Sequence, residues 1–128
     1  MSVMHAMICS TGDLIERDSF SAGNDVEAFQ IGRDDIDNVD AMVQDLMKVA
    51  LNRMLTSLFD LEKPLVAMVQ GFAIGIGFTM LSMADFVYCS PDARFFTPFM
   101  QSYQSPEGGS SKMFPEIFGP HKASEILL

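Results

Sequence analysis

Apolar positions along the chain form two different patterns, a spacing typical of helices and an uninterrupted run typical of buried strands. Between Asp37 and Phe59 they recur every three or four residues, which predicts a long amphipathic helix. The apolar positions of this stripe are Val39, Val43, Met47, Ala50, Met54 and Leu58. After Pro64, the run from Leu65 to Val69 is entirely apolar, as expected of a strand buried on both faces of a sheet.

Shorter elements are predicted on both sides of this helix and strand. Residues 2–9 are a candidate first strand, and "DFVYCS" and "ARFFTPF" are candidates for a second buried strand and a short strand ended by Pro98. "GGSSKMFPEIFG" and "HKASEILL" predict two short helices separated by Gly119 and Pro120. Strands that alternate with helices, without a repeat or a linker, predict an α/β fold.

Three glycines, Gly71, Gly75 and Gly77, separate the buried strand from the apolar run of residues 78–84. This order predicts a strand, a glycine turn and a buried helix, and the first amides of such a helix have no partner within it. One interpretation is that these amides bind a negatively charged group. The other is that glycine allows close packing of the backbone. The segment lacks the lysine of a P-loop and the spacing of a dinucleotide-binding turn.

Composition and charge exclude several classes of function. A formal net charge of −9 leaves no basic surface for nucleic acid, so we expect no nucleic-acid partner. The longest apolar stretch is interrupted by polar residues and glycines, so we expect no membrane span. Cys9 and Cys89 lack metal-ligand spacing, and we expect no metal site. The first ten residues lack the basic region of a signal peptide, and no targeting signal is recognised.

The stretch "SPEGGSS" places one carboxylate, Glu107, between a proline and two glycines. From these neighbours alone, Glu107 is a solvated turn residue, because proline and glycine are typical of surface turns. The alternative is a carboxylate that a tight turn holds in place as a general base. The residues alone leave both interpretations open.

Four segments in this order resemble the crotonase (enoyl-CoA hydratase/isomerase) superfamily, and most closely its peroxisomal-type Δ3,Δ2-enoyl-CoA isomerases. They are "FSAGNDVEAF", "KPLVAMVQGFAIGIGFTML", "ADFVYCSPDARFFTPF" and "QSPEGGSSKMFPEIFGPHKASEILL". The resemblance covers residues 20–128 and about half of the family's domain. It implies a crotonase-like spiral of ββα units. We therefore expect residues 1–128 to be a partial crotonase-like domain, truncated at both ends.

The resemblance also implies a site and a reaction, the shift of a 3-enoyl-CoA double bond to the 2-trans position in β-oxidation of unsaturated fatty acids. Glu107, in Q-S-P-E-G, is then the catalytic base. The backbone amides of Asn24 and Ile76 form the oxyanion hole for the enolate. The substrate-binding residues are Ser21, Ala22, Gly23, Asn24, Asp25 and Gly75. For Asp25, pinning of the oxyanion loop through backbone amides is the alternative to direct contact with the substrate.

Hydratases of the superfamily carry two glutamates that activate water, and aligning the segments places Thr79 and Phe99 at those positions. Neither is a base, which disfavours water addition. The resemblance implies no cofactor, since the coenzyme A thioester is the substrate, and it implies a homotrimer in a peroxisome or mitochondrion. Two alternatives stay open: an inactive crotonase-like module that binds acyl-CoA or a protein, and other enolate chemistry from the same carboxylate.

Overall fold

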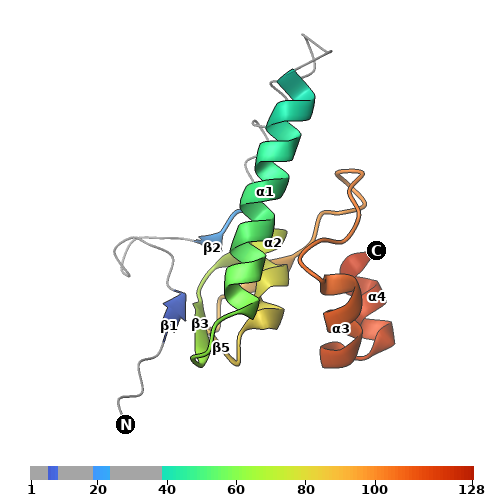
Figure 1. Ribbon diagram of the computed structural model, residues 1–128. Helices are drawn as coiled ribbons and strands as arrows, with labels where there is room; N and C mark the ends of the chain where they lie inside the picture. The colour runs from blue at the N-terminus through green and yellow to red at the C-terminus, as the bar shows by residue number, and fades with distance from the viewer. Residues whose placement is uncertain (1–5, 9–18, 24–38) are drawn as a thin grey trace. The chain divides into compact units, whose positions relative to one another are not determined.

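The computed structural model describes residues 6–8, 19–23 and 39–128, and the chain divides into two units (Figure 1). One unit, residues 24–61, contributes helix α1 (Val39–Phe59) to the described part of the chain. The helix predicted for residues 37–59 is confirmed from its third position, because residues 37 and 38 lie outside the described residues. Of its predicted apolar stripe, Leu58 is half-buried whereas Met54 is exposed.

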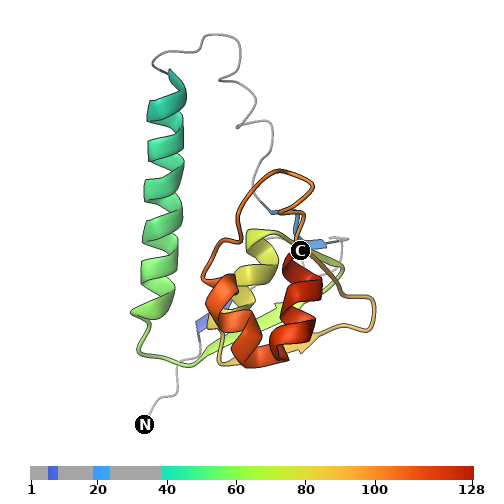
Figure 2. The same cartoon turned by 90° about the vertical axis from the view of Figure 1, so that its right-hand side faces the viewer.

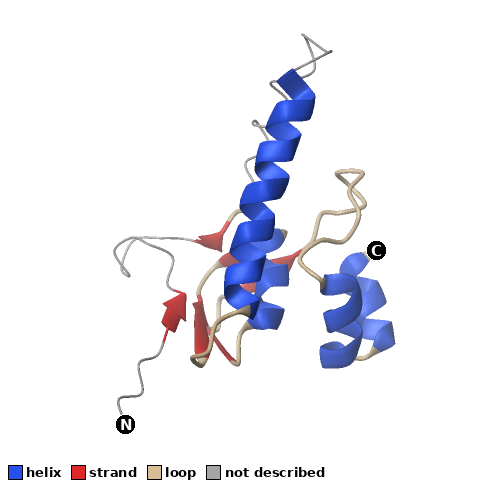
Figure 3. Ribbon diagram, in the orientation of Figure 1, coloured by secondary structure: helices blue, strands red, loops and turns tan. Residues whose placement is uncertain are grey.

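The other unit, residues 1–23 and 62–128, contains two sheets of three parallel strands each. The first sheet has the order β1-β3-β5 and the second the order β2-β4-β6. Figure 3 shows the strands in red. The strands of the first sheet are β1 (Ala6–Ile8), β3 (Leu65–Val69) and β5 (Phe86–Cys89). Those of the second sheet are β2 (Ser19–Ser21), β4 (Phe72–Ile74) and β6 (Arg94–Phe96).

The strand order shows a spiral, because consecutive strands enter different sheets. Each pair of strands adds one strand to the first sheet and one to the second, always in the parallel direction. A helix follows the second strand of each pair before the chain returns to the first sheet, as parallel neighbours require. The predicted α/β fold, a spiral of ββα units, is confirmed.

Two strands were absent from the sequence prediction. Strand β4 lies inside the predicted glycine turn, between Gly71 and Gly75, which both have positive φ. Strand β2 begins at Ser19 and ends at Ser21, inside "FSAGND", where no strand is predicted from the sequence. Helix α2 (Ile76–Thr79) accordingly begins two residues before the predicted start at Phe78 and continues as a 3₁₀ turn, η2 (Met80–Met83).

The predicted burial of β3 on both faces and the predicted burial of β5 are wrong. Strand β3 buries Leu65, Ala67 and Val69, but Met68 on its other face is 46% exposed. All four residues of β5 are exposed. Strand β5 lies at the edge of its sheet in the described part of the chain, so one side of it has no neighbouring strand.

The last two helices form a side-by-side pair (Figures 1 and 2). They are α3 (Ser110–Phe118) and α4 (Pro120–Leu127), and Gly119 between them has a φ of 78°. Both predicted helices are thus confirmed. The core of this unit consists of Phe20, Ala67, Val69, Ala73, Phe78, Leu81, Phe99, Phe114, Ala123 and Leu127. Among the described helices, none is both long and apolar enough to cross a membrane.

Candidate active site

The end of strand β2 packs directly against the first turn of helix α2. A Cβ atom at Gly77 would lie 2.5 Å from Ser21 Cβ and 2.6 Å from Ser21 Oγ. Only glycine fits at this position unless Ser21 moves. The Ser21 hydroxyl in turn accepts a hydrogen bond of 3.2 Å from the Gly23 amide, which holds the turn that follows β2.

Two glycines of this turn and of α2 also approach each other closely. Gly23 has a φ of 87°, and a Cβ there would lie 2.9 Å from the carbonyl oxygen of Ile74. Gly75 has a φ of 56°, and a Cβ there would lie 4.0 Å from Gly23 Cα. Positive φ and missing side chains together let the backbone segments meet here.

Helix α2 starts at this meeting point. The Gly75 carbonyl accepts hydrogen bonds of 3.0 Å from the amides of Phe78 and Thr79. The amides of Ile76 and Gly77 come before these first bonds of the helix, and amides in such positions point out of the N-terminus. The Gly75 amide itself donates to the carbonyl of Phe96 on strand β6. The helix start is therefore anchored to the second sheet.

Glu107 reaches this helix start from the segment between β6 and α3. A Cβ atom at Gly75 would lie 3.9 Å from Glu107 Oε1, so the carboxylate lies beside the Gly75 backbone. Glu107 is half-buried. Glu107, more than 30 positions after Gly75 in the chain, thus brings a carboxylate to the glycine turn. We call Gly23, Gly75, Gly108 and Glu107 the glycine corner.

Gly108 explains how the Glu107 segment approaches α2 so closely. It is buried with a φ of 63°, and a Cβ there would lie 2.6 Å from Thr79 Oγ1 and 3.2 Å from Ile76 Cδ1. Thr79 is fully buried, and its hydroxyl has a long contact of 3.5 Å with the carbonyl of Ile76. Phe99, the other position aligned with a hydratase glutamate, is also fully buried and belongs to the core.

The structure brings together most of the predicted site residues that it describes. Ser21, Gly23, Gly75, Ile76 and Glu107 meet at the glycine corner. Ala22 is exposed. Asn24 and Asp25 lie outside the described residues, so one of the two predicted oxyanion amides is not placed. The roles of all these residues stay predictions.

Sequence reasoning did not single out Gly108 and Ser110. Ser110 is fully buried, and its amide and hydroxyl both donate to the Glu107 carbonyl, at 3.1 and 2.7 Å. A serine three residues after Glu107, following two glycines, is the signal that could have indicated this turn. In the part of the chain that the structure describes, no group of three or more His, Cys, Asp or Glu side chains could hold a metal ion.

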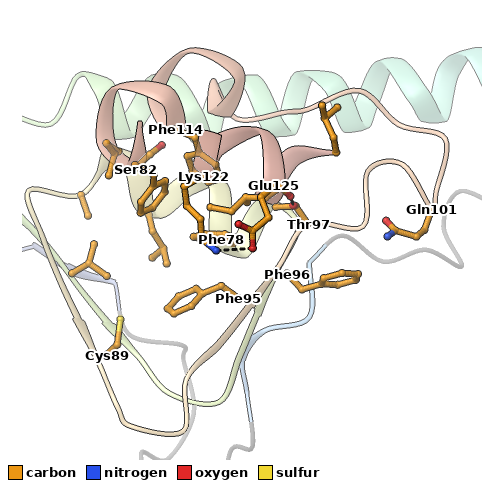
Figure 4. Close-up of a pocket in the computed structure, with 17 residues that line it drawn as sticks. Phe78, Ser82, Cys89, Phe95, Phe96, Thr97, Gln101, Phe114, Lys122 and Glu125 are labelled. Atoms are coloured by element: carbon orange, nitrogen blue, oxygen red, sulfur yellow. Dashed lines mark hydrogen bonds and ion pairs between the residues drawn. The ribbon is translucent and has the colours of Figure 1, made fainter. Parts of the chain in front are cut away.

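A larger hollow lies on the side of α2 and η2 that faces α3 and α4 (Figure 4). Its volume is about 790 Å³, and apolar and aromatic side chains make up most of its wall. Phe78, Leu81, Phe95 and Phe114 are among them, and an ion pair of 2.7 Å between Lys122 and Glu125 lies at its wall. None of the residues of the glycine corner lines it. We call this hollow the apolar cavity.

Comparison with known proteins supports the assignment of the fold and extends it to a family. A model of the enoyl-CoA hydratase/isomerase family matches residues 10–128. A crystal structure of an enoyl-CoA hydratase/isomerase from Pseudoalteromonas atlantica is 32% identical, with a TM-score of 0.73, over 95% of this chain and 43% of that one. The chain therefore has the crotonase fold, and it belongs to the enoyl-CoA hydratase/isomerase family.

Two curated relatives differ in what their names describe. Peroxisomal enoyl-CoA delta isomerase 3 of Mus musculus is 41% identical over 111 residues, which are 87% of this chain and 34% of the relative. Chromodomain Y-like protein of Homo sapiens is 38% identical over 82 residues, which are 64% of this chain and 14% of the relative. This chain thus spans about a third of the first relative and far less of the second.

Proposed function

We propose that the domain to which this chain belongs is a Δ3,Δ2-enoyl-CoA isomerase with Glu107 as its base. One observation carries the proposal: the Glu107 carboxylate lies beside the Gly75 backbone, where helix α2 begins. The similarity to an enoyl-CoA delta isomerase supports the same reaction. A base and a backbone amide that are neighbours can act on adjacent atoms of one thioester.

The reaction needs the Glu107 carboxylate and the Ile76 backbone amide at once. Glu107 removes a proton from C2, and the electron pair of that C–H bond forms a C1–C2 double bond while the thioester oxygen becomes negative. The Ile76 amide donates to this oxygen, and loss of one such donor typically costs on the order of 10² to 10³ in rate. Glu107 then returns the proton to C4, and the double bond ends between C2 and C3. The same carboxylate serves both transfers, so no second base is required.

Water addition is disfavoured at this site. The two positions aligned with the water-activating glutamates of hydratases are Thr79 and Phe99, and both are fully buried. A hydroxyl with an ordinary acidity and a phenyl ring cannot deprotonate water. The domain is therefore expected to isomerise a 3-enoyl-CoA far faster than it hydrates a 2-enoyl-CoA.

The test combines binding and turnover. Calorimetric titration with an acyl-CoA comes first, followed by assays of 3-enoyl-CoA isomerisation and of 2-enoyl-CoA hydration on the same preparation. Isomerisation well above hydration supports the proposal. Equal rates of the two reactions would reject it and leave the fold assignment intact. Binding with conversion to another product would favour other enolate chemistry.

A second candidate function is an acyl-CoA-binding or protein-binding module without turnover. The similarity to chromodomain Y-like protein favours it, because that name does not describe an enzyme. The two candidates differ in one measurement: the module binds its ligand but leaves a 3-enoyl-CoA unchanged. Absence of both binding and turnover would reject the isomerase and leave a protein partner as the ligand of the module.

The remaining parts of the proposal concern context. We propose an acyl-CoA as the substrate, a peroxisome as the compartment and a homotrimer as the assembly of the complete domain. The compartment rests on the name of the relative from Mus musculus. The trimer rests on the family resemblance alone, and sedimentation analysis tests it.

A further inference from the structure

Glu107 lies in a segment outside the helices and strands. The residues just before and after it belong to turns and loops, and Gly108 and Gly109 both have positive φ, at 63° and 74°. Glycines sample such angles and many others with little cost, so they do not by themselves select one backbone conformation. A contact from outside these two glycines is needed to fix the backbone from which the carboxylate extends.

Ser110 provides that contact. Its amide and its hydroxyl both donate to the carbonyl oxygen of Glu107, at 3.1 and 2.7 Å, which closes the turn over the two glycines. Ser110 is fully buried and is the first residue of α3, and Phe114, one turn later, is fully buried in the core. The turn is thereby connected to a helix that the core holds in place.

The opposite side of the turn rests on α2. Gly108 lies against Thr79 and Ile76 so closely that a Cβ atom at Gly108 would collide with the Thr79 hydroxyl. The Glu107 backbone is therefore held between Ser110 on α3 and Thr79 on α2. We infer that Ser110 is a positioning residue, which sets the orientation of the Glu107 carboxylate toward the Gly75 backbone through the bond to the Glu107 carbonyl. Its effect on turnover rests on the proposed function.

The test compares Ser110→Ala with Ser111→Ala. Ser111 is the next residue of the same helix and is exposed, so its replacement changes one serine without touching the turn. In the 128-residue chain labelled with ¹³C at the glutamate carboxyl carbons, Glu107→Gln identifies the Glu107 signal. Ser110→Ala should shift this signal and its titration midpoint, and should speed amide exchange at residues 107–110. Ser111→Ala should change neither.

A second readout uses turnover, if the chain isomerises a 3-enoyl-CoA. Ser110→Ala should lower kcat about fivefold to tenfold, as loss of one hydrogen bond would, with KM within about twofold. Ser110→Cys keeps a side chain of similar size with a weaker donor. Its kcat should lie between those of the unmodified chain and Ser110→Ala. The circular dichroism spectrum and thermal midpoint of each variant separate local change from unfolding.

The outcomes distinguish this inference from the function on which it rests. An unchanged Glu107 signal in folded Ser110→Ala or Ser110→Cys would overturn the inference, whatever the activity. A shifted signal together with full activity in Glu107→Gln would reject the proposed base and keep Ser110 as the residue that positions Glu107. If Ser110→Ala unfolds, the Ser110→Cys signal decides, and a signal identical to that of the unmodified chain would overturn the inference.

Discussion

The glycine corner and the apolar cavity both adjoin helix α2, but they are built from different kinds of residue. At the corner, side chains are missing at Gly23, Gly75 and Gly108. A Cβ atom would collide with the Ile74 backbone at Gly23 and with the Thr79 side chain at Gly108. In the cavity, large side chains surround about 790 Å³ of open space. Missing side chains thus shape the corner, whereas large side chains shape the cavity.

Under the proposed function, the site of chemistry in this unit is the glycine corner and not the large cavity. The large cavity offers apolar surface but, of the residues proposed to react with or bind the thioester, it contains none. The small corner places the Glu107 carboxylate beside a helix start, the arrangement that proton transfer and enolate stabilisation need. Catalytic groups need fixed positions, and tight packing supplies them.

The largest effect should come from Glu107→Gln, which keeps the shape of the corner and removes its proposed base. Isomerisation by the active domain should fall by about 10² to 10⁴, the usual contribution of general acid–base catalysis. Acyl-CoA affinity should stay within a few-fold, because the base acts on a proton and not on coenzyme A. Steady-state assays and calorimetric titration measure the two quantities.

The matched control is Glu116→Gln, on the exposed surface of α3. It removes the same charge from the same region, so any general effect of charge appears in both variants. Activity of Glu107→Gln within tenfold of the unmodified protein would mean that the corner is not the site of chemistry.

An intermediate effect is expected when a methyl group is added to the corner. Gly108→Ala forces an unfavourable φ and also a collision with Thr79. At Gly109, which has a similar φ of 74°, a Cβ atom would make only an ordinary contact of 3.7 Å with Met113 Sδ. Gly109→Ala should therefore cost about 1 to 2 kcal/mol of unfolding free energy from the left-handed backbone alone. Gly108→Ala should cost about 1 to 3 kcal/mol more from overpacking. Denaturant titration measures both, and equal losses would show that the corner is loosely packed.

The collision can be tested separately from backbone strain. Thr79→Ala removes the hydroxyl that a methyl group at Gly108 would meet. Gly108→Ala should therefore cost less stability in the Thr79→Ala background than in the unmodified chain, which a double-mutant cycle measures. Additive losses would mean that Thr79 does not limit the approach of the Glu107 segment.

The sequence predicts well those elements that its own residues specify. The long helix, strand β3 and the last two helices follow from period, length and the positions of Pro64, Gly119 and Pro120. Strands β2 and β4 have three residues each, too few to show any period, and pairing with neighbouring strands defines them. The spiral repeats strand, strand and helix without repeating its sequence, so no repeat was visible in the chain.

Burial and the site depend still more on distant parts of the chain. Ala67 and Val87 lie opposite each other in register, but Ala67 is in the middle strand and buried, whereas Val87 is in an edge strand and 41% exposed. Their apolar character alone does not distinguish these environments. Similarly, Glu107 has the neighbours of a surface turn, and only the family resemblance indicated a base. Ser110 resembles any other serine until the turn over Gly108 and Gly109 is seen.

The smallest effect on stability, and the one specific to the cavity, is expected for Val87→Lys. Val87 lines the apolar cavity from edge strand β5, near other exposed apolar residues of β5 and β6. A lysine on an exposed edge strand opposes pairing with another chain. Self-association in analytical ultracentrifugation should therefore decrease, while the unfolding free energy changes by no more than about 0.5 kcal/mol, as for most exposed positions. Asn52→Lys, on helix α1 of the other unit, adds the same charge at an exposed residue that does not line the cavity. Either lysine brings the net charge of −9 closer to zero, which by itself weakens repulsion between chains.

Less association in Val87→Lys but not in Asn52→Lys would assign the effect to the cavity edge. Equal behaviour of the two variants would mean that the exposed side chains around the cavity do not drive association, and the contrast with the glycine corner would then rest on packing alone.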